Sequence, residues 1–103
     1  KIEYNQALNY FEYMKDGIKL EIEKNYLTLK AKQKVFRQKQ KAQKLAAEVL
    51  EQSTQMYKNH LINMNDLLMQ QANEQKANAE AILAKYEATM AAAILKISLG
   101  EEL

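Results

Sequence analysis

Few side chains in this sequence could carry out acid–base, nucleophilic or metal chemistry. The 103 residues include one histidine, His60, two serines, Ser53 and Ser98, and no cysteine. A Ser–His–Asp or Cys–His catalytic set would have to use His60, which lies where nothing would bury it. The spacing of metal-ligating residues and the glycine-rich loop that cradles phosphate are both missing. We therefore expect no enzyme activity, no metal site and no cofactor.

The strongest charge signal is the run KAKQKVFRQKQKAQK over residues 30–44. No acidic residue lies between Lys24 and Glu48. One helical stripe carries five cations, which are Lys30, Lys34, Arg37, Lys41 and Lys44. Such a stripe could bind nucleic acid or anionic lipid. The net charge is only +2, and the run has a single aromatic residue. A solvated helix face is therefore the favoured interpretation, and we expect no nucleic-acid partner.

The elements that hold these residues are helices. Alanine, lysine, glutamine, glutamate and leucine dominate, proline is absent, and the glycines are Gly17 and Gly100. These are good helix formers, and no strand-type alternation occurs. The longest uncharged run is eight residues, whereas a membrane-spanning helix needs roughly 20. The sequence predicts an all-α fold, a long antiparallel hairpin with one helix over about 2–57 and another over about 63–99.

A first helix of that length would extend roughly 84 Å, which is typical of a coiled coil or long bundle. It carries two apolar stripes at steps of three, four and seven. The first comprises Tyr4, Leu8, Phe11, Ile18, Ile22, Leu29 and Phe36, and the second Ala31, Val35, Ala42, Leu45, Val49 and Met56. Two stripes on one helix predict neighbours on two sides.

The second helix has one main stripe and many extra alanines. The stripe comprises Leu68, Ala72, Ala79, Ile82, Tyr86, Ala93 and Ile97, and the further alanines are at 77, 81, 84, 88, 91 and 92. The alanines permit two interpretations, either a solvent face of high helix propensity or a helix wedged between two others in a wall or tube.

The corner between the helices is predicted from local chemistry. Asn63 can cap the second helix, with Asp66 three residues on, as a capping box with Asp in place of Glu. Asn59 is expected to take the left-handed conformation that usually calls for glycine. Gly100 is expected to end the second helix.

Several segments together resemble the TolC-like outer-membrane efflux proteins. Residues 21–29 (EIEKNYLTL) are similar to the E-V-x-x-A-Y-x-x-L run of that family. Further similar segments follow in the family's order over about residues 18–100, namely AEVL (47–50), Tyr57, DLLMQQ (66–71), AKY (84–86) and LKISLG (95–100). His60 stands where the family has a tip glycine, and Met69 where some members carry a second acidic residue. The first hairpin repeat and the barrel strands of such proteins have no counterpart here, so we expect this chain to be part of a longer protein.

This resemblance implies a trimer whose hairpins form a periplasmic tube below an outer-membrane barrel. The tube exports small molecules or proteins from an inner-membrane pump joined by a periplasmic adaptor. The implied adaptor-facing tip comprises Asn59, His60, Leu61, Ile62 and Asn63, with Leu61 and Ile62 as exposed apolar contacts. Asp66 would lie at the channel entrance, where its carboxylate, repeated by the trimer, makes a negative ring. The alternative for Asp66 is a helix-capping charge alone. Tyr57 and Tyr86 are expected to be packing residues.

Two other functions remain open on the residues. A cytoplasmic coiled-coil scaffold, or a self-associating structural protein, is the main alternative, and a basic nucleic-acid-binding hairpin is the third. In each case the aromatic first turns of the long helix overhang the shorter one and need cover from another chain. Alone, the chain would also leave its apolar stripes exposed, and we expect these to drive self-association into a dimer or small bundle.

Overall fold

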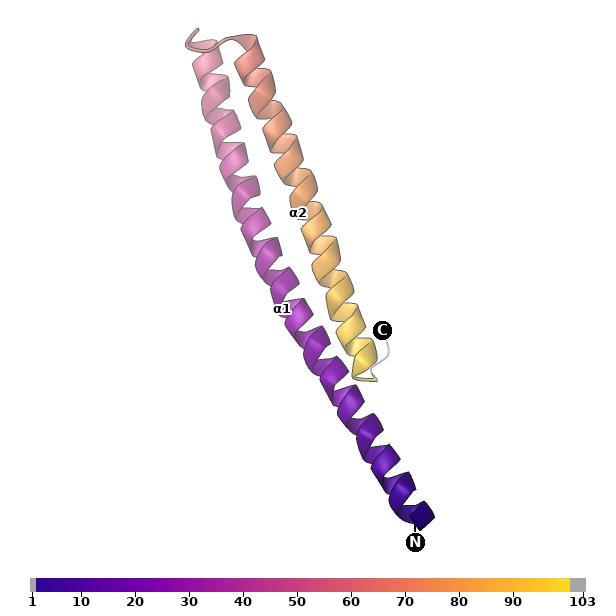
Figure 1. Cartoon of the computed structure of the whole chain (residues 1–103). Helices are drawn as coiled ribbons and strands as arrows, with labels where there is room; N and C mark the ends of the chain where they lie inside the picture. The colour runs from indigo at the N-terminus through magenta and orange to yellow at the C-terminus, as the bar shows by residue number, and fades with distance from the viewer. Residues whose placement is uncertain (1, 101–103) are drawn as a thin grey trace.

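The protein is an extended hairpin of two antiparallel helices. The computed structural model describes residues 2–100. Helix α1 spans Ile2–Lys58 and helix α2 spans Met64–Ser98. They pack side by side in a molecule of 88 × 20 × 15 Å, with the connecting corner at one end (Figure 1). The predicted all-α hairpin is confirmed, and each predicted helix boundary lies within one residue of the observed one.

A strict heptad seam joins the two helices. The partly or fully covered residues of α1 recur at alternating steps of three and four, and they are Ile22, Asn25, Leu29, Lys32, Phe36, Lys39, Gln43, Ala46, Leu50, Ser53 and Tyr57, with Val49 and Thr54 beside them. The same spacing on α2 gives Leu67, Gln70, Glu74, Ala77, Ala81, Ala84, Ala88, Ala91, Leu95 and Ser98. An alternating three-and-four repeat keeps one face toward one partner, as in a coiled coil.

Large side chains of α1 pack against small ones of α2. The α1 seam supplies Ile22, Leu29, Phe36 and Leu50, while Ala81, Ala84 and Ala91 are buried on α2. Alanine on one side lets the axes approach while larger residues fill the space between them. The extra alanines of the second helix therefore line the hairpin seam. Neither of the two predicted roles, a solvent face or a helix wedged between two others, had described this.

The predicted main stripe of the second helix points elsewhere. Leu68, Ile82, Tyr86 and Ile97 are all exposed, and so are Val35, Leu45 and Met56 of the second α1 stripe. Tyr57 is half-buried in the seam, but Tyr86 makes no such packing inside the hairpin. The hairpin consequently carries unpartnered apolar stripes on both helices, in addition to its own seam.

The core of the isolated hairpin is thin. The buried apolar residues are Leu67 and three alanines, and no large side chain among the described residues is fully buried. Burying an alanine contributes far less than burying a leucine or phenylalanine, since the gain scales with apolar area. Contacts with further helices would therefore add substantially to the stability of this chain.

Helix α1 extends well beyond the end of α2 (Figure 1). Seam coverage begins at Ile22, and every described residue before it is exposed, including the aromatic residues Tyr4, Tyr10, Phe11 and Tyr13. The predicted overhang is therefore present. Gly17 interrupts neither the helical hydrogen bonding nor the course of α1. Neither helix described has a stretch long and apolar enough to cross a membrane.

Candidate functional site: the hairpin tip and the outer faces

The end of α1 is a Schellman motif centred on His60. The backbone N–H of Leu61 donates to the carbonyl oxygen of Met56 at 2.8 Å, and that of His60 donates to Tyr57 at 3.0 Å. His60 has φ 61°, the one positive value among the described non-glycine residues. The motif requires a left-handed residue at this position, where glycine is usual. The prediction that Asn59 takes this conformation is therefore wrong, because α1 continues through Lys58 and moves the left-handed position one residue on.

The start of α2 is a complete capping box. The backbone N–H of Asp66 donates to Oδ1 of Asn63 at 2.8 Å, and the N–H of Asn63 donates to Oδ2 of Asp66 at 3.4 Å. Both donors would otherwise lack a partner within the helix. The negative charge of Asp66 also lies in the first turn, where the helix dipole favours it. The structure thus contains the helix cap that the sequence predicts.

The two apolar tip residues have different surroundings. Leu61 is 69% exposed, whereas Ile62 is half-buried and lines a small hollow with Met56, Met69 and Asp66. Ile62 directly precedes the cap and Leu67 is the fourth helical residue, which are the two positions of a hydrophobic staple. Ile62 therefore has a local structural role, and Leu61 is the apolar tip side chain that is available to a partner.

The remaining tip side chains, including His60 and Asp66, are exposed. Within residues 2–100, no group of three or more His, Cys, Asp and Glu side chains is placed to hold a metal ion. The carboxylate of Asp66 accepts a hydrogen bond in the cap and still faces solvent. It can therefore stabilise the helix end and also interact with a ligand or partner. The tip offers an exposed leucine, an imidazole and a carboxylate within a rigid, fully capped turn.

Two ion pairs cross between the helices along the same side of the seam. Lys32 Nζ lies 3.2 Å from Glu87 Oε2, and Lys39 Nζ lies 3.1 Å from Glu80 Oε2. The pairs are seven residues apart on each helix, so one helix cannot slide by a turn without separating both. Sequence reasoning missed them, although two lysines and two glutamates each at a seven-residue spacing was a usable signal.

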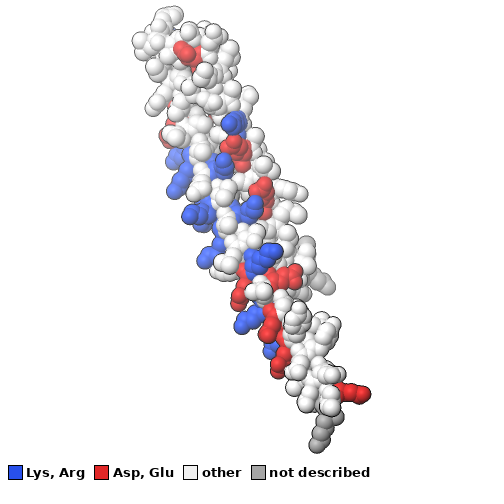
Figure 2. Space-filling model, viewed as in Figure 1, with Lys and Arg blue, Asp and Glu red and all other residues white. Residues whose placement is uncertain are grey.

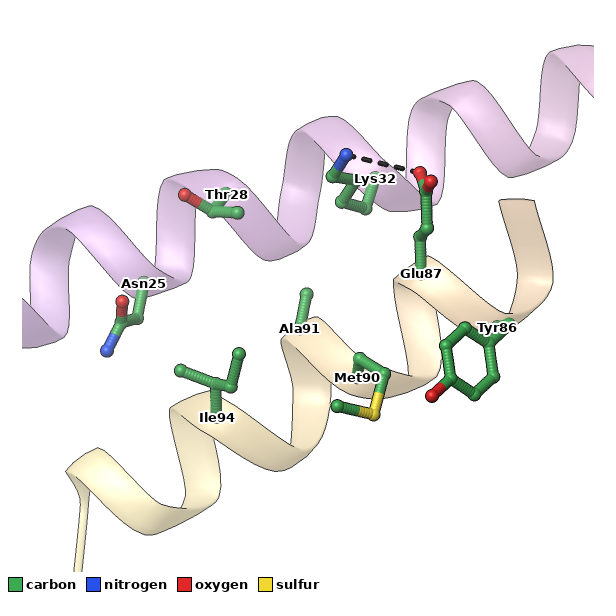
Figure 3. A pocket seen from close by; sticks show the side chains of 8 residues that line it. All are labelled: Asn25, Thr28, Lys32, Tyr86, Glu87, Met90, Ala91 and Ile94. Atoms are coloured by element: carbon green, nitrogen blue, oxygen red, sulfur yellow. Dashed lines mark hydrogen bonds and ion pairs between the residues drawn. The ribbon is translucent and has the colours of Figure 1, made fainter. Parts of the chain in front are cut away.

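A shallow groove opens beside the first of these pairs (Figure 3). In that view Lys32 and Glu87 reach toward each other across the space between the helices. The groove is lined by Asn25, Thr28 and Lys32 from α1 and by Tyr86, Glu87, Met90, Ala91 and Ile94 from α2. Near its end, the side-chain amide of Asn25 donates to the hydroxyl of Ser98, which joins α1 to the last turn of α2. The lining is mainly apolar, as expected of a surface that receives a neighbouring helix.

The cationic stripe lies on the middle of α1. Figure 2 shows Lys and Arg gathered over the central part of the hairpin, with largely uncharged surface toward the tip. Lys32 and Lys39 are paired with glutamates of α2, and Lys30 lies over the ring of Tyr26 with Nζ 5.3 Å from its centroid. Part of the run thus serves contacts within the hairpin, and the exposed remainder is consistent with a solvated face.

Comparison with protein-family models, with curated proteins and with solved structures finds no match to this chain.

Proposed function

We propose that this hairpin is part of the wall and the pump-facing tip of a trimeric outer-membrane efflux or secretion channel. In this proposal the outer membrane holds the channel through a barrel contributed by other parts of the protein, and the hairpin lies in the periplasm. The tip residues 59–63 contact a periplasmic adaptor protein, which joins the channel to an inner-membrane pump.

The observation that carries the proposal is the placement of the apolar stripes outside the seam. Val35 and Leu45 on α1 and Ile82 and Ile97 on α2 are exposed, although each belongs to a helically spaced apolar row. Large unpartnered apolar surfaces indicate interaction sites. A hairpin with such rows on both helices is suited to packing between two neighbours, as a tube wall requires. The ordered similarity of segments over residues 18–100 points to the same architecture.

The features of the tip support the proposed contact with the adaptor protein. It is fixed by a Schellman motif and a capping box, and it exposes Leu61 and Asp66. A rigid tip presents its contact side chains at little entropic cost, which favours binding. Three copies of Asp66 around a threefold axis would place negative charge at the entrance and favour cations.

Localisation of the native protein tests the proposal directly. An antibody raised against the purified chain is used on membrane and soluble fractions of cells that carry the gene. The channel predicts that the antigen is found in the outer-membrane fraction, in a polypeptide several times larger than the 11.9 kDa of this chain. An antigen confined to the cytosol would reject the channel and favour the coiled-coil scaffold. Sequencing the gene upstream of Lys1 provides a second check, since a channel requires barrel-type strands and an earlier hairpin.

The adaptor contact is tested by cross-linking at the tip in the native protein. The chain has no cysteine, so Leu61→Cys would introduce one thiol into this hairpin, at its most accessible apolar tip position. The proposal predicts a cross-link to an adaptor protein in whole cells. Gln40→Cys is the control, because Gln40 is exposed, lies far from the tip and belongs to neither apolar row of α1. A cross-link to the adaptor from the control site alone would contradict the tip assignment.

A further inference from the structure

One broad face of the hairpin carries a row of mainly apolar residues on each helix. Both rows repeat every seven residues, and they comprise Thr28, Val35, Ala42, Val49 and Met56 on α1 and Met69, Lys76, Leu83 and Met90 on α2. All of them except the half-buried Val49 are exposed. The rows lie on one side of the seam, because Thr28 and Met90 line the same groove, and Met56 and Met69 line the same hollow near the tip. We call the two rows together the apolar face.

Both ion pairs between the helices lie on the apolar face. Lys32 and Glu87 line the same groove and meet there (Figure 3). The pair of Lys39 and Glu80 follows one heptad along the hairpin. The apolar face thus has charges of both signs along its middle, with an apolar row on either side of them.

The opposite broad face is cationic. Each of its heptad-spaced cations follows a member of the α1 row by two residues, about 200° around the helix, and these cations are Lys30, Arg37 and Lys44. Two copies would repel each other through such a face, since its charges have one sign. Of the two broad faces, the apolar face is therefore the one open to a second copy.

The apolar face places smaller residues of α1 level with larger ones of α2. The ion pairs fix this register, in which Lys32 is level with Glu87 and Lys39 with Glu80. The same register sets each small member of the α1 row across the seam from a longer side chain, namely Thr28 from Met90, Val35 from Leu83, Ala42 from Lys76 and Val49 from Met69. A face with one small row and one large row complements itself when the small row of one copy meets the large row of the other.

We propose that the apolar face binds the same face of a second copy of this chain, in a parallel twofold pair with both tips at one end. A twofold axis along the length of the hairpin brings the α1 row of each copy against the α2 row of the other. Val35 then packs on the partner's Leu83, and Val49 packs on the partner's Met69. Each helix has only antiparallel neighbours, as in an up-and-down four-helix bundle.

The charges favour the same orientation. Lys32 of one copy lies opposite the partner's Glu87 as well as beside its own, so four alternating charges form a ring, and Lys39 with Glu80 forms a second ring. The additional partner helps to offset the cost of removing these groups from water. An antiparallel pair would instead set α1 against α1 and α2 against α2, which brings lysines toward lysines and glutamates toward glutamates.

The area of the apolar face is sufficient for a stable pair. The α1 row from Thr28 to Met56 is about 42 Å long, and the hairpin is 20 Å wide. The face therefore offers about 800 Å² per copy, which is the standard size of a specific interface. We expect a dissociation constant of about 10 µM or below. The interface lies within residues 28–90, so sequence on either side of the described residues can continue without entering it.

The pair goes beyond the proposed channel function and does not depend on it. A wall one hairpin thick uses the edges of the hairpin, where Ile82 and Ile97 lie, and leaves its broad faces open. The channel fails if the native protein is cytosolic, whereas the pair fails on the association of the 103-residue chain, so the two failures are distinguishable.

Light scattering and small-angle X-ray scattering of the purified chain test the proposal over about 1–500 µM. The mass should rise from one copy to two, while the maximum dimension stays near the 88 Å of one hairpin, because the copies lie parallel and side by side. An antiparallel pair through the same face would measure about 115 Å, because the two α1 overhangs point in opposite directions. A chain that stays monomeric, a mass beyond two copies, or a dimer of that greater length would overturn the proposal.

Matched substitutions show whether the apolar face is the interface. Leu83→Ala with Met90→Ala removes two large side chains from the α2 row and should weaken dimerisation by at least about tenfold. The control, Leu68→Ala with Ile82→Ala, removes as many atoms from exposed residues of the same helix that lie outside the apolar face, and it should change the dissociation constant by less than about twofold. Alanine preserves the helix in both, which circular dichroism verifies. Equal loss of dimer in the two variants, or a dimer that neither affects, would overturn the proposal.

A charge exchange tests the parallel orientation. Lys32→Glu with Glu87→Lys keeps the ion pair within the hairpin but reverses it, so this variant should dimerise with itself about as well as the unchanged chain. In a mixed dimer with the unchanged chain, lysine would face lysine and glutamate would face glutamate. Native mass spectrometry of the two chains mixed, one of them isotopically labelled, should therefore show far fewer mixed dimers than random pairing gives. Random pairing would overturn the proposed orientation.

Discussion

Lys39 of α1 is bound to Glu80 of α2, with Nζ 3.1 Å from Oε2, and an equivalent pair, Lys32 with Glu87, lies one heptad away. Both pairs are about 40% exposed, so each contributes only about 0.2–1 kcal/mol. Their common spacing matters more than their strength. The α2 side of the seam is largely repeated alanines, which specify register weakly, and the two pairs add a charge pattern that a slip of three or four residues would break.

We expect reversal of one charge to destabilise the hairpin and reversal of both to restore it. Lys39→Glu places two carboxylates together and should lower the free energy of unfolding by about 1 kcal/mol, while Lys39→Glu with Glu80→Lys should regain most of the loss. Urea denaturation of the wild type, the singles and the double measures the coupling. The coupling should shrink in about 1 M salt. If the effects of the two single substitutions simply add in the double variant, the pair has no coupling energy and does not help to set the register.

The capping box predicts a specific cost at Asn63. Asn63→Ala leaves the N–H of Asp66 without its acceptor and should reduce the free energy of unfolding by about 1 kcal/mol. Asn65→Ala is the control, because Asn65 is an exposed residue of the same turn with no capping bond. Thermal or urea denaturation distinguishes the two. Similar losses from both substitutions would mean that the cap contributes little.

The left-handed residue predicts that glycine is better than histidine at position 60. A non-glycine residue in this conformation costs about 1–2 kcal/mol. Glycine avoids this cost, but it also gives the unfolded chain more conformational freedom, which offsets part of the gain. His60→Gly should therefore stabilise the hairpin by about 0.5–1 kcal/mol. Asn59→Gly should destabilise it, since position 59 has no positive φ and gains nothing from glycine. If Asn59→Gly raised the denaturation midpoint and His60→Gly lowered it, the left-handed residue would be Asn59 and not His60.

The helices and their ends follow from sequence because their signals are local. Helix-forming composition, the Asn63 and Asp66 pair, and Gly100, which has φ 80° just after α2, each act within a turn or two of the chain. The position of the left-handed residue at the tip could not be predicted from such local signals. Asparagine is the better candidate by preference alone, but the position is set by where α1 stops, and α1 extends one residue further than predicted.

Hydrophobicity alone does not identify which face of α2 forms the seam with α1. Leu68, Ile82 and Ile97 form the more apolar row, yet the helix presents Ala81, Ala84 and Ala91 to α1. The choice depends on fit across the interface, because large residues of α1 leave space only for small ones opposite. Periodicity identifies a face, but it does not identify which partner that face meets.

Gly17 lies in the segment of α1 that has no partner in the hairpin, and a Cβ added there meets nothing within 4 Å. Gly17→Ala should therefore favour the local helix by about 1 kcal/mol. Amide hydrogen exchange near residues 13–20 should slow by about fivefold, while the midpoint of hairpin unfolding stays unchanged. A rise in that midpoint equal to the local gain would show that the overhang and hairpin unfold as one unit.

The alanine seam predicts opposite outcomes for two otherwise similar substitutions. Ala84 is 5% exposed and faces α1, so Ala84→Leu forces the helices apart and should destabilise the hairpin by about 1–3 kcal/mol. Ala79→Leu adds the same atoms on an exposed row of the same helix and should change stability by less than about 0.5 kcal/mol. Urea denaturation below the concentration at which the chain associates gives both values. If Ala79→Leu were the damaging change, the row of Leu68 and Ile82 would be the true seam, and the alanines would face outward.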